Sequence, residues 1–131
     1  MRTLAASDDP YEAIYGYSRA IRVGDHVHVS GTSAQPPFIE GCDSYTQAKN
    51  ALAIIEKSLE DVGANLAAVV RTVAYVTDIA DIPLVARAHL EAFEKIRPAS
   101  TIVEVSALDH PARTVEIEAY AICLSPEAEI T

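Results

Sequence analysis

The sequence predicts an α+β domain in which two helices pack on one face of a mixed β-sheet. Three observations support this prediction: two segments with apolar residues at helical spacing, strand-like segments rich in valine and threonine around them, and a C-terminal segment in which apolar and polar residues alternate. Strands and helices in such an order form a sheet that is covered by helices. With 131 residues, half of them hydrophobic, the chain is expected to form one domain with a single core.

The expected elements follow the order ββ–α–β–α–ββ. The predicted strands span residues 18–23, 26–30, 69–78, 101–106 and 114–123, and the predicted helices span residues 44–62 and 81–95. Ser44 followed by Gln47 has the form of a capping box, and Asp81 is the expected N-cap of the second helix. Residues 1–10 and 125–131 are expected to be loosely held ends of the domain, which spans 1–131.

The last predicted strand carries a glutamate at two alternate positions. Side chains alternate between faces along a strand, so Glu116 and Glu118 point to the same side and their apolar neighbours point to the other. We expect Ile102 and Ile122 to share the glutamate face, away from the helices. Exposed apolar surface on a sheet often marks an interface, which favours an oligomer.

The composition argues against two classes of partner. The formal net charge is −9 and the sequence has no basic run, whereas nucleic-acid affinity rests largely on clustered lysine and arginine. No apolar run approaches the ~20 residues that a membrane span needs, and the first ten residues lack the apolar stretch of a secretory signal. We therefore expect no nucleic acid, no membrane and a cytoplasmic location.

Cysteine and histidine spacing predicts no metal site. Cys42 and Cys123 match neither metal-ligand spacing nor a disulfide framework and are expected to be reduced thiols. His26 and His28 lie two residues apart on one predicted strand, and imidazole is a common metal ligand. No third ligand can be named for them, so two surface histidines are the preferred interpretation.

Nearly the whole chain, residues 16–124, resembles the RidA family, also called YjgF/YER057c/UK114 or L-PSP. The resemblance rests mainly on RPASTIVEV at residues 97–105 and VEIEAYA at residues 115–121, and is supported by GYSRA at 16–20, VSG at 29–31, VAYVTD at 73–78 and LEAF at 90–93. It implies a chorismate-mutase-like fold, a homotrimer, and small-molecule sites in the clefts between subunits.

The resemblance also implies a reaction. Imine-hydrolysing members of the family convert 2-imino acids to 2-oxo acids and ammonia, and this chemistry requires no metal and no organic cofactor. Glu118 aligns with the water-positioning glutamate of the family, a role that suits a carboxylate. Tyr17 aligns with a tyrosine of the cleft, and the family motif places Ser30 and Gly31 at the site.

Several positions of the cleft depart from the family pattern. Ser100 stands where the imine-hydrolysing members carry an arginine, Arg87 where they often carry asparagine, and Ile102 where many carry cysteine. Serine offers one donor and no charge, while an arginine binds a carboxylate through two charge-assisted hydrogen bonds. A hydrogen bond to a charged group contributes about 1.5–3 kcal/mol, so the change should weaken 2-imino acid binding tens of times or more.

Three interpretations of this pattern remain open. Arg87 replaces the missing cation, or the cleft accepts a neutral or differently shaped molecule and hydrolyses an imine, enamine or related C–N bond. Alternatively the protein has no turnover, and is a small-molecule sensor or a trimeric partner of another protein. The endoribonuclease activity ascribed to some relatives is disfavoured, because the chain is acidic and lacks aromatic residues interleaved with basic ones.

Overall fold

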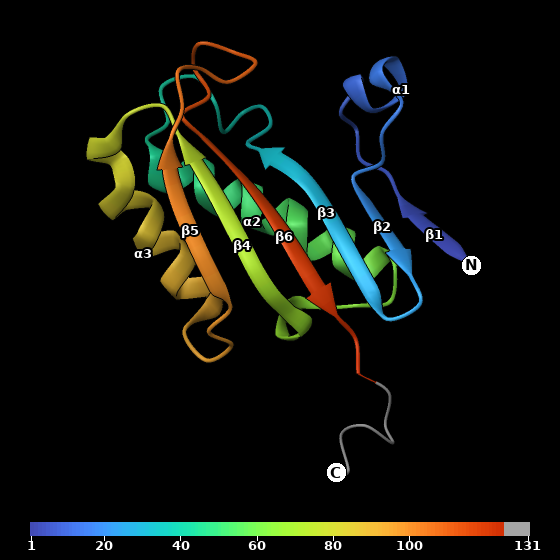
Figure 1. Cartoon of the computed structure of the whole chain (residues 1–131). Helices are drawn as coiled ribbons and strands as arrows, with labels where there is room; N and C mark the ends of the chain where they lie inside the picture. The colour runs from blue at the N-terminus through green and yellow to red at the C-terminus, as the bar shows by residue number, and fades with distance from the viewer. Residues whose placement is uncertain (125–131) are drawn as a thin grey trace.

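The chain forms a six-stranded mixed sheet with two long helices on one face, and Figure 1 views the sheet from the uncovered face. The computed structural model describes residues 1–124. Along the chain, the strands are β1 (Arg2–Ala5), β2 (Ala20–Val23), β3 (His26–Ser33), β4 (Val69–Val76), β5 (Ala99–Glu104) and β6 (Val115–Ile122). The helices are α1 (Tyr11–Tyr15), α2 (Ser44–Asp61) and α3 (Ile82–Phe93), with 3₁₀ turns η1 (Leu66–Ala68) and η2 (Ile79–Asp81). None of the described helices is long and apolar enough to cross a membrane.

The last strand of the chain lies in the middle of the sheet. The strand order is β1-β2-β3-β6-β4-β5, and β6 pairs antiparallel with both β3 and β4. β5 is an edge strand that pairs parallel with β4, because α3 carries the chain back between them. The predicted α+β fold, a mixed sheet with two helices on one face, is confirmed (Figure 1).

The core lies between the sheet and the two long helices. Alternate residues of β6 are buried there, as the alternation in the sequence predicted: Val115, Ile117, Ala119 and Ala121. The helical spacing in α2 likewise places one stripe of side chains in this core, which comprises Ala48, Leu52, Ile55 and Leu59. The glutamates of β6 consequently project from the opposite, open face.

The prediction that Ile102 shares this open face is wrong. In the parallel β4–β5 register Ile102 pairs with Ala74, which is buried under the helices, and Ile102 itself packs against the core. Ser100 pairs with the buried Thr72 and so lies on the helix side as well. Ile122 does share the face of Glu118, since the two are four residues apart on β6.

The start of α2 differs by one residue from the predicted capping box. Asp43 is the N-cap, and its Oδ1 accepts a hydrogen bond of 2.8 Å from the Thr46 backbone N–H. Ser44 instead donates to Asp81 Oδ2 at 2.8 Å, which ties the start of α2 to the start of α3. Gln47 is fully buried and its amide donates to backbone carbonyls of two loops, so this residue holds loops together rather than capping the helix.

The N-terminal segment forms structure that was not expected from the sequence. Arg2–Ala5 were predicted to belong to a loosely held end, but they form β1 and pair antiparallel with β2. The short run contains too few residues for its alternation to be recognised, and its partner strand supplies the hydrogen bonds. Residues 125–131, the other predicted loose end, lie outside the described residues.

Candidate functional site

A bulge in β3 places two of the predicted site residues opposite Glu118. The β3–β6 register shifts between Val29 and Thr32, so that Ser30 and Gly31 together oppose the single residue Glu118. Bulges of this kind redirect side chains and backbone locally, and they are common beside functional sites. The structure thus brings Ser30, Gly31 and Glu118 together on the open face.

Glu118 is held by a tyrosine from the neighbouring strand. The Tyr75 hydroxyl donates a short hydrogen bond to Glu118 Oε1, and this bond, followed by burial, raises the pKa of Tyr75. A raised pKa keeps the phenol protonated and therefore a donor at neutral pH. A depression of about 100 Å³ lies beside Glu118, between β3, β6 and β4.

Glu116 occupies space that only a glycine leaves open. A Cβ atom at Gly31 would lie 2.6 Å from Glu116 Oε2, well inside normal contact distance. The glutamate side chain therefore extends across the open face toward the bulge in β3. This close approach explains why a glycine suits position 31 although its backbone φ is not positive.

A buried arginine supports the bulge from behind. Arg19 is only 3% exposed, and its Nη1 donates to the Gly31 carbonyl at 2.7 Å and to Thr32 Oγ1 at 3.0 Å. Its Nη2 donates to the Tyr17 hydroxyl at 3.3 Å, and its guanidinium lies 5.4 Å from the Tyr17 ring centroid. Tyr17 and Gly31 are thereby linked through one side chain.

The charge of Arg19 is balanced by Glu12 from α1. Arg19 Nε lies 3.3 Å from Glu12 Oε2, and both side chains are buried. Burial alone would raise the pKa of Glu12, but hydrogen bonds from Ser7 and Arg19 outweigh it and lower the pKa below the ordinary value. The pair therefore fixes α1 and Tyr17 against the end of β3.

Ser100 belongs to a separate hydrogen-bonded group on the helix side. Thr72 Oγ1 donates to Ser100 Oγ at 2.8 Å and lies 2.8 Å from His89 Nε2 of α3. Because the single hydrogen of Thr72 goes to Ser100, His89 donates to Thr72 through Nε2. Ser100 is exposed, so its own hydrogen is free to meet a ligand acceptor. Within one chain, Ser100 and Glu118 lie on opposite faces of the sheet.

Arg87 does not join Ser100 within the chain. Its guanidinium carbon lies 3.8 Å from the ring centroid of Tyr45 on α2, which places it against the outer side of the helix layer. Among the described residues it makes no hydrogen bond to Ser100. The hypothesis that Arg87 replaces the missing cation receives no support from the arrangement of one chain.

Burial of His89 makes the stability of the fold depend on pH. Desolvation lowers the pKa of His89 below 6.5, so the unfolded chain binds the proton more tightly than the folded chain does. The contribution of His89 is therefore complete above about pH 6.5 and is lost as the pH falls through its folded-state pKa. We expect urea titrations to show decreasing stability from pH 7 downward, and a smaller slope in His89→Gln. An equal slope in both proteins would contradict this.

The two strand histidines flank an aromatic residue on the open face. The ring centroid of His28 lies 4.6 Å from that of Tyr120, and the Tyr120 hydroxyl forms a short hydrogen bond with His26 Nδ1. Within residues 1–124, no three His, Cys, Asp or Glu side chains converge in the manner of a metal site.

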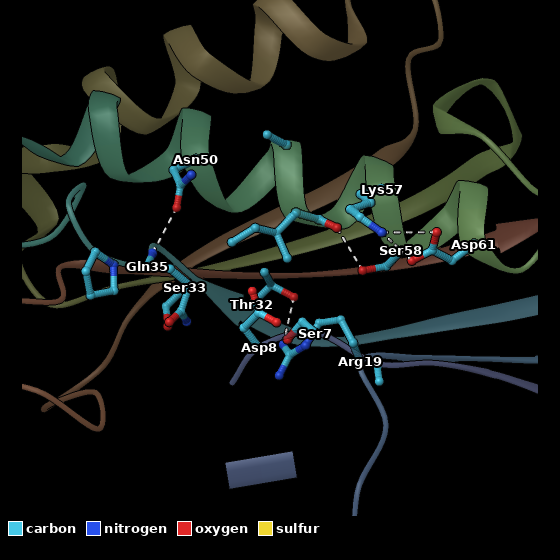
Figure 2. Close-up of a pocket in the computed structure, with 14 residues that line it drawn as sticks. Ser7, Asp8, Arg19, Thr32, Ser33, Gln35, Asn50, Lys57, Ser58 and Asp61 are labelled. Carbon is cyan, nitrogen blue, oxygen red and sulfur yellow. Dashed lines mark hydrogen bonds and ion pairs between the residues drawn. The ribbon is translucent and has the colours of Figure 1, made fainter. Parts of the chain in front are cut away.

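A wide groove on the helix side does not coincide with this site. It has a volume of about 790 Å³ and lies between α2 and the segment that joins β1 to α1 (Figure 2). Several of its polar side chains have partners within the chain: Lys57 Nζ lies 2.9 Å from Asp61 Oδ2, and Asn50 Oδ1 accepts from the Gln35 backbone N–H at 2.9 Å (Figure 2). Arg19 reaches the groove as well, but its hydrogen bonds go to Gly31, Thr32 and the acidic residues around it.

Sequence reasoning assigned no site role to Arg19, Tyr75 or Glu116. The position of Tyr75 on the open face could have been predicted from the alternation of β4. Arg19 immediately precedes the buried Ala20, but its burial depends on Glu12 and Gly31, which lie elsewhere in the sequence. The proximity of Glu116 to Gly31 follows from the bulge, which no local pattern predicts.

The fold and the site define a small α+β protein whose open sheet face carries a pair of carboxyl groups beside a glycine bulge. The family model described as Endoribonuclease L-PSP matches residues 7–123 of this chain. The crystal structure of Rv2704 from Mycobacterium tuberculosis, described as a member of the YjgF/YER057c/UK114 family, is 46% identical and matches with a TM-score of 0.87, over 93% of this chain and 99% of that one.

Two relatives show similar identity by sequence. The uncharacterized protein SCO2049 of Streptomyces coelicolor is 34% identical over 119 residues, which cover 87% of this chain and 88% of the relative. The RutC family protein PYRAB12510 of Pyrococcus abyssi is 34% identical over 109 residues, 80% of this chain and 84% of the relative. The chain belongs to the RidA family, also known as YjgF/YER057c/UK114 or L-PSP.

Proposed function

We propose that this protein hydrolyses the C=N bond of a small imine or enamine in clefts between the subunits of a homotrimer. Glu118 positions the attacking water, and Ser30, Gly31 and Tyr17 line the same part of the cleft. The observation that carries the proposal is the register of β3 and β6, which sets the bulge at Ser30 and Gly31 directly opposite Glu118. A carboxylate that faces open space beside exposed backbone suits the placing of water next to a flat substrate.

The arrangement of one chain supports an intersubunit cleft. Ser100 and Ile102 lie on the helix side of the sheet edge, whereas Glu118 lies on the open face. Both groups can line one pocket only when the edge strand of a second copy approaches the open face of the first. The uncovered face carries half-exposed aromatic and apolar side chains, as expected of an interface.

The substrate at this cleft is expected to lack a compact carboxylate. Ser100 offers a hydroxyl donor oriented by Thr72, but no positive charge. A neutral imine suits such a donor, since its nitrogen, or a neutral oxygen elsewhere on the molecule, accepts one hydrogen bond. The test measures carbonyl formation above the spontaneous rate with two sources of imine: an amino-acid oxidase, which releases 2-imino acids, and an amine oxidase, which releases neutral imines. No acceleration in either assay would contradict the proposal.

Introducing an arginine at position 100 should change ligand preference. Ser100 is exposed, so Ser100→Arg can present its guanidinium without burying charge. We expect affinity for 2-oxobutyrate, a stable analogue of a 2-imino acid, to increase tens of times, on the basis of about 1.5–3 kcal/mol for a hydrogen bond to a charged group. Calorimetric titration measures this affinity. Ser106→Arg, which adds the same charge to an exposed loop, is the matched control, and equal affinities in the two variants would contradict the expectation.

A second candidate is a trimeric protein that binds a small molecule or another protein without turnover. It is favoured by the Tyr75 hydroxyl, which already occupies one oxygen of Glu118 and leaves fewer positions for water. Binding without any rate acceleration, unaffected by replacement of Glu118, would support this candidate over hydrolysis.

A further inference from the structure

We infer that His89 gives the Ser100 end of the cleft a positive charge in mildly acidic solution, so that small carboxylates such as 2-oxo acids bind there. Near neutral pH the same position is an uncharged hydroxyl donor that suits neutral ligands. His89 acts through Thr72 and Ser100 and is therefore a positioning residue, since only Ser100 touches the ligand. The inference rests on the ligand-binding part of the proposed function and does not require turnover.

One chain of hydrogen bonds leads from His89 to the exposed hydroxyl of Ser100. His89 Nε2 lies 2.8 Å from Thr72 Oγ1, and Thr72 Oγ1 donates to Ser100 Oγ at 2.8 Å. Thr72 is only 1% exposed, and each hydroxyl carries a single hydrogen, so every donor in this chain points from the helix toward Ser100. The three residues come from the paired strands β4 and β5 and from α3, which lies beside them (Figure 1).

His89 can take up a proton without breaking this chain. Its Nε2 already carries the hydrogen that is donated to Thr72, so the second proton binds at Nδ1. Among residues 1–124, Nδ1 makes no hydrogen bond. The ring borders a depression of about 240 Å³ at the end of α3, through which water can reach it. Protonation therefore adds a positive charge behind Ser100 and leaves the direction of the hydrogen bonds unchanged.

The protonated ring strengthens the donor that Ser100 presents. Hydrogen bonds from a charged donor are roughly twice as strong as those between neutral groups, and linked hydroxyls polarise one another. Because Thr72 is buried, the charge acts through the protein and is screened less than it would be in bulk water. A carboxylate bound at Ser100 consequently gains more from protonation of His89 than an uncharged ligand does.

The groups that surround His89 do not already supply this charge. Burial alone lowers the pKa of His89 below its ordinary value, and no charged partner contributes. Glu94, at the end of α3, and Arg97, in the loop after it, border the same depression and carry opposite charges. The contacts from β4 and β5 are the uncharged hydroxyls of Thr72 and Ser100.

The charged groups between α2 and α3 face away from His89. Arg87 and Glu91 each lie two residues from it on α3, and residues at that spacing do not share a helix face. Lys49 of α2 pairs with Glu91 at 3.3 Å, and Arg87 lies over the ring of Tyr45. Within the described part of the chain, His89 is therefore the titratable group that hydrogen bonds connect to Ser100.

Binding of 2-oxobutyrate by the full-length protein at several pH values tests this role. A ligand that prefers the protonated form gains affinity as the pH falls toward the pKa of His89, which lies below 6.5. Between about pH 7.5 and 5, we expect the calorimetric affinity to rise about tenfold more in the wild type than in His89→Gln, within the usual range for coupled binding events. Glutamine can still donate to Thr72 but does not titrate.

Two controls separate His89 from the other groups that titrate in the cleft. His110→Gln removes a half-exposed histidine of the β5–β6 loop and should match the wild type. The uncharged 2-oxobutyramide has the same size as 2-oxobutyrate and should bind with nearly constant affinity. Protonation of Glu116 and Glu118 affects the wild type and His89→Gln alike, so the difference between these two proteins reports His89.

Imidazole NMR of the wild type gives a measurement that needs no variant. Nitrogen shifts near neutral pH should show a hydrogen on Nε2 and none on Nδ1 of His89. Saturation with 2-oxobutyrate should raise the pKa of His89 by about one unit, because coupling is reciprocal. Equal pH dependence in the wild type and His89→Gln, a pKa that 2-oxobutyrate leaves unchanged, or no binding at any pH would overturn this inference. Failure to accelerate carbonyl formation from either imine source would instead overturn the proposed hydrolysis alone, so the two failures are distinguishable.

Discussion

Replacing Arg19 by methionine is expected to lower the free energy of unfolding by about 3–5 kcal/mol, the usual result when one partner of a buried ion pair is removed. Methionine replaces only the aliphatic part of arginine and leaves the Glu12 carboxylate buried without its cation. It also removes the hydrogen bonds to the Gly31 carbonyl and to Thr32. Urea unfolding followed by circular dichroism measures the change.

Two further variants make the Arg19 result interpretable. Arg2→Met alters an exposed arginine of β1 and should change stability by less than about 0.5 kcal/mol. If Arg19→Met does not fold, the double variant Arg19→Met with Glu12→Gln should fold, because it removes the unpaired carboxylate. A loss below about 1 kcal/mol in Arg19→Met would mean that the buried pair is not structurally important.

Glu118→Gln is expected to lower kcat about 10²–10⁴-fold, the range over which a positioned acid or base contributes to a rate. Glutamine keeps the size of the side chain and can still accept a hydrogen bond from the Tyr75 hydroxyl, so the strand and its register should be retained. It cannot take a proton from water. The measurement is carbonyl formation in the oxidase-coupled assay, for whichever imine the wild type accelerates.

The interpretation of Glu118→Gln requires that the assembly is unchanged. Light scattering should give the same mass for wild type and variant, and their thermal midpoints should agree within a few degrees. Glu56→Gln is the matched control, since it makes the same substitution on an exposed helix face. Wild-type turnover in Glu118→Gln would contradict the role of Glu118 in hydrolysis.

The parts of the fold that were predictable are those encoded in local spacing. The apolar stripe of α2 and the alternation of β6 both depend only on the period of their own element. The face of Ile102 depends instead on the parallel register that α3 imposes on β5, which is not a property of the residues around position 102. For the same reason β1 was missed, because its four residues form a strand only in the presence of β2.

The same distinction between local spacing and long-range contacts applies to the candidate site. The direction of Glu118 followed from alternation, whereas its placement opposite Ser30 and Gly31 follows from the bulge in β3. The roles of Arg19 and Tyr75 in holding the site depend on contacts between segments distant in the sequence. Glu116 was placed on the correct face, but its approach to Gly31 arises from the extra residue in β3.

The separation of Ser100 from Glu118 by the thickness of the sheet has a consequence for how such a protein diverges. Position 100 sits on an exposed edge strand, and a change there disturbs one hydrogen bond from Thr72 but none of those around Glu118. If the proposed function holds, ligand selectivity at position 100 can therefore change without disturbing the contacts of Glu118 within the same chain. A lineage can therefore exchange the residue at position 100 while Glu118 keeps its hydrogen bond with Tyr75 on the opposite face of the sheet.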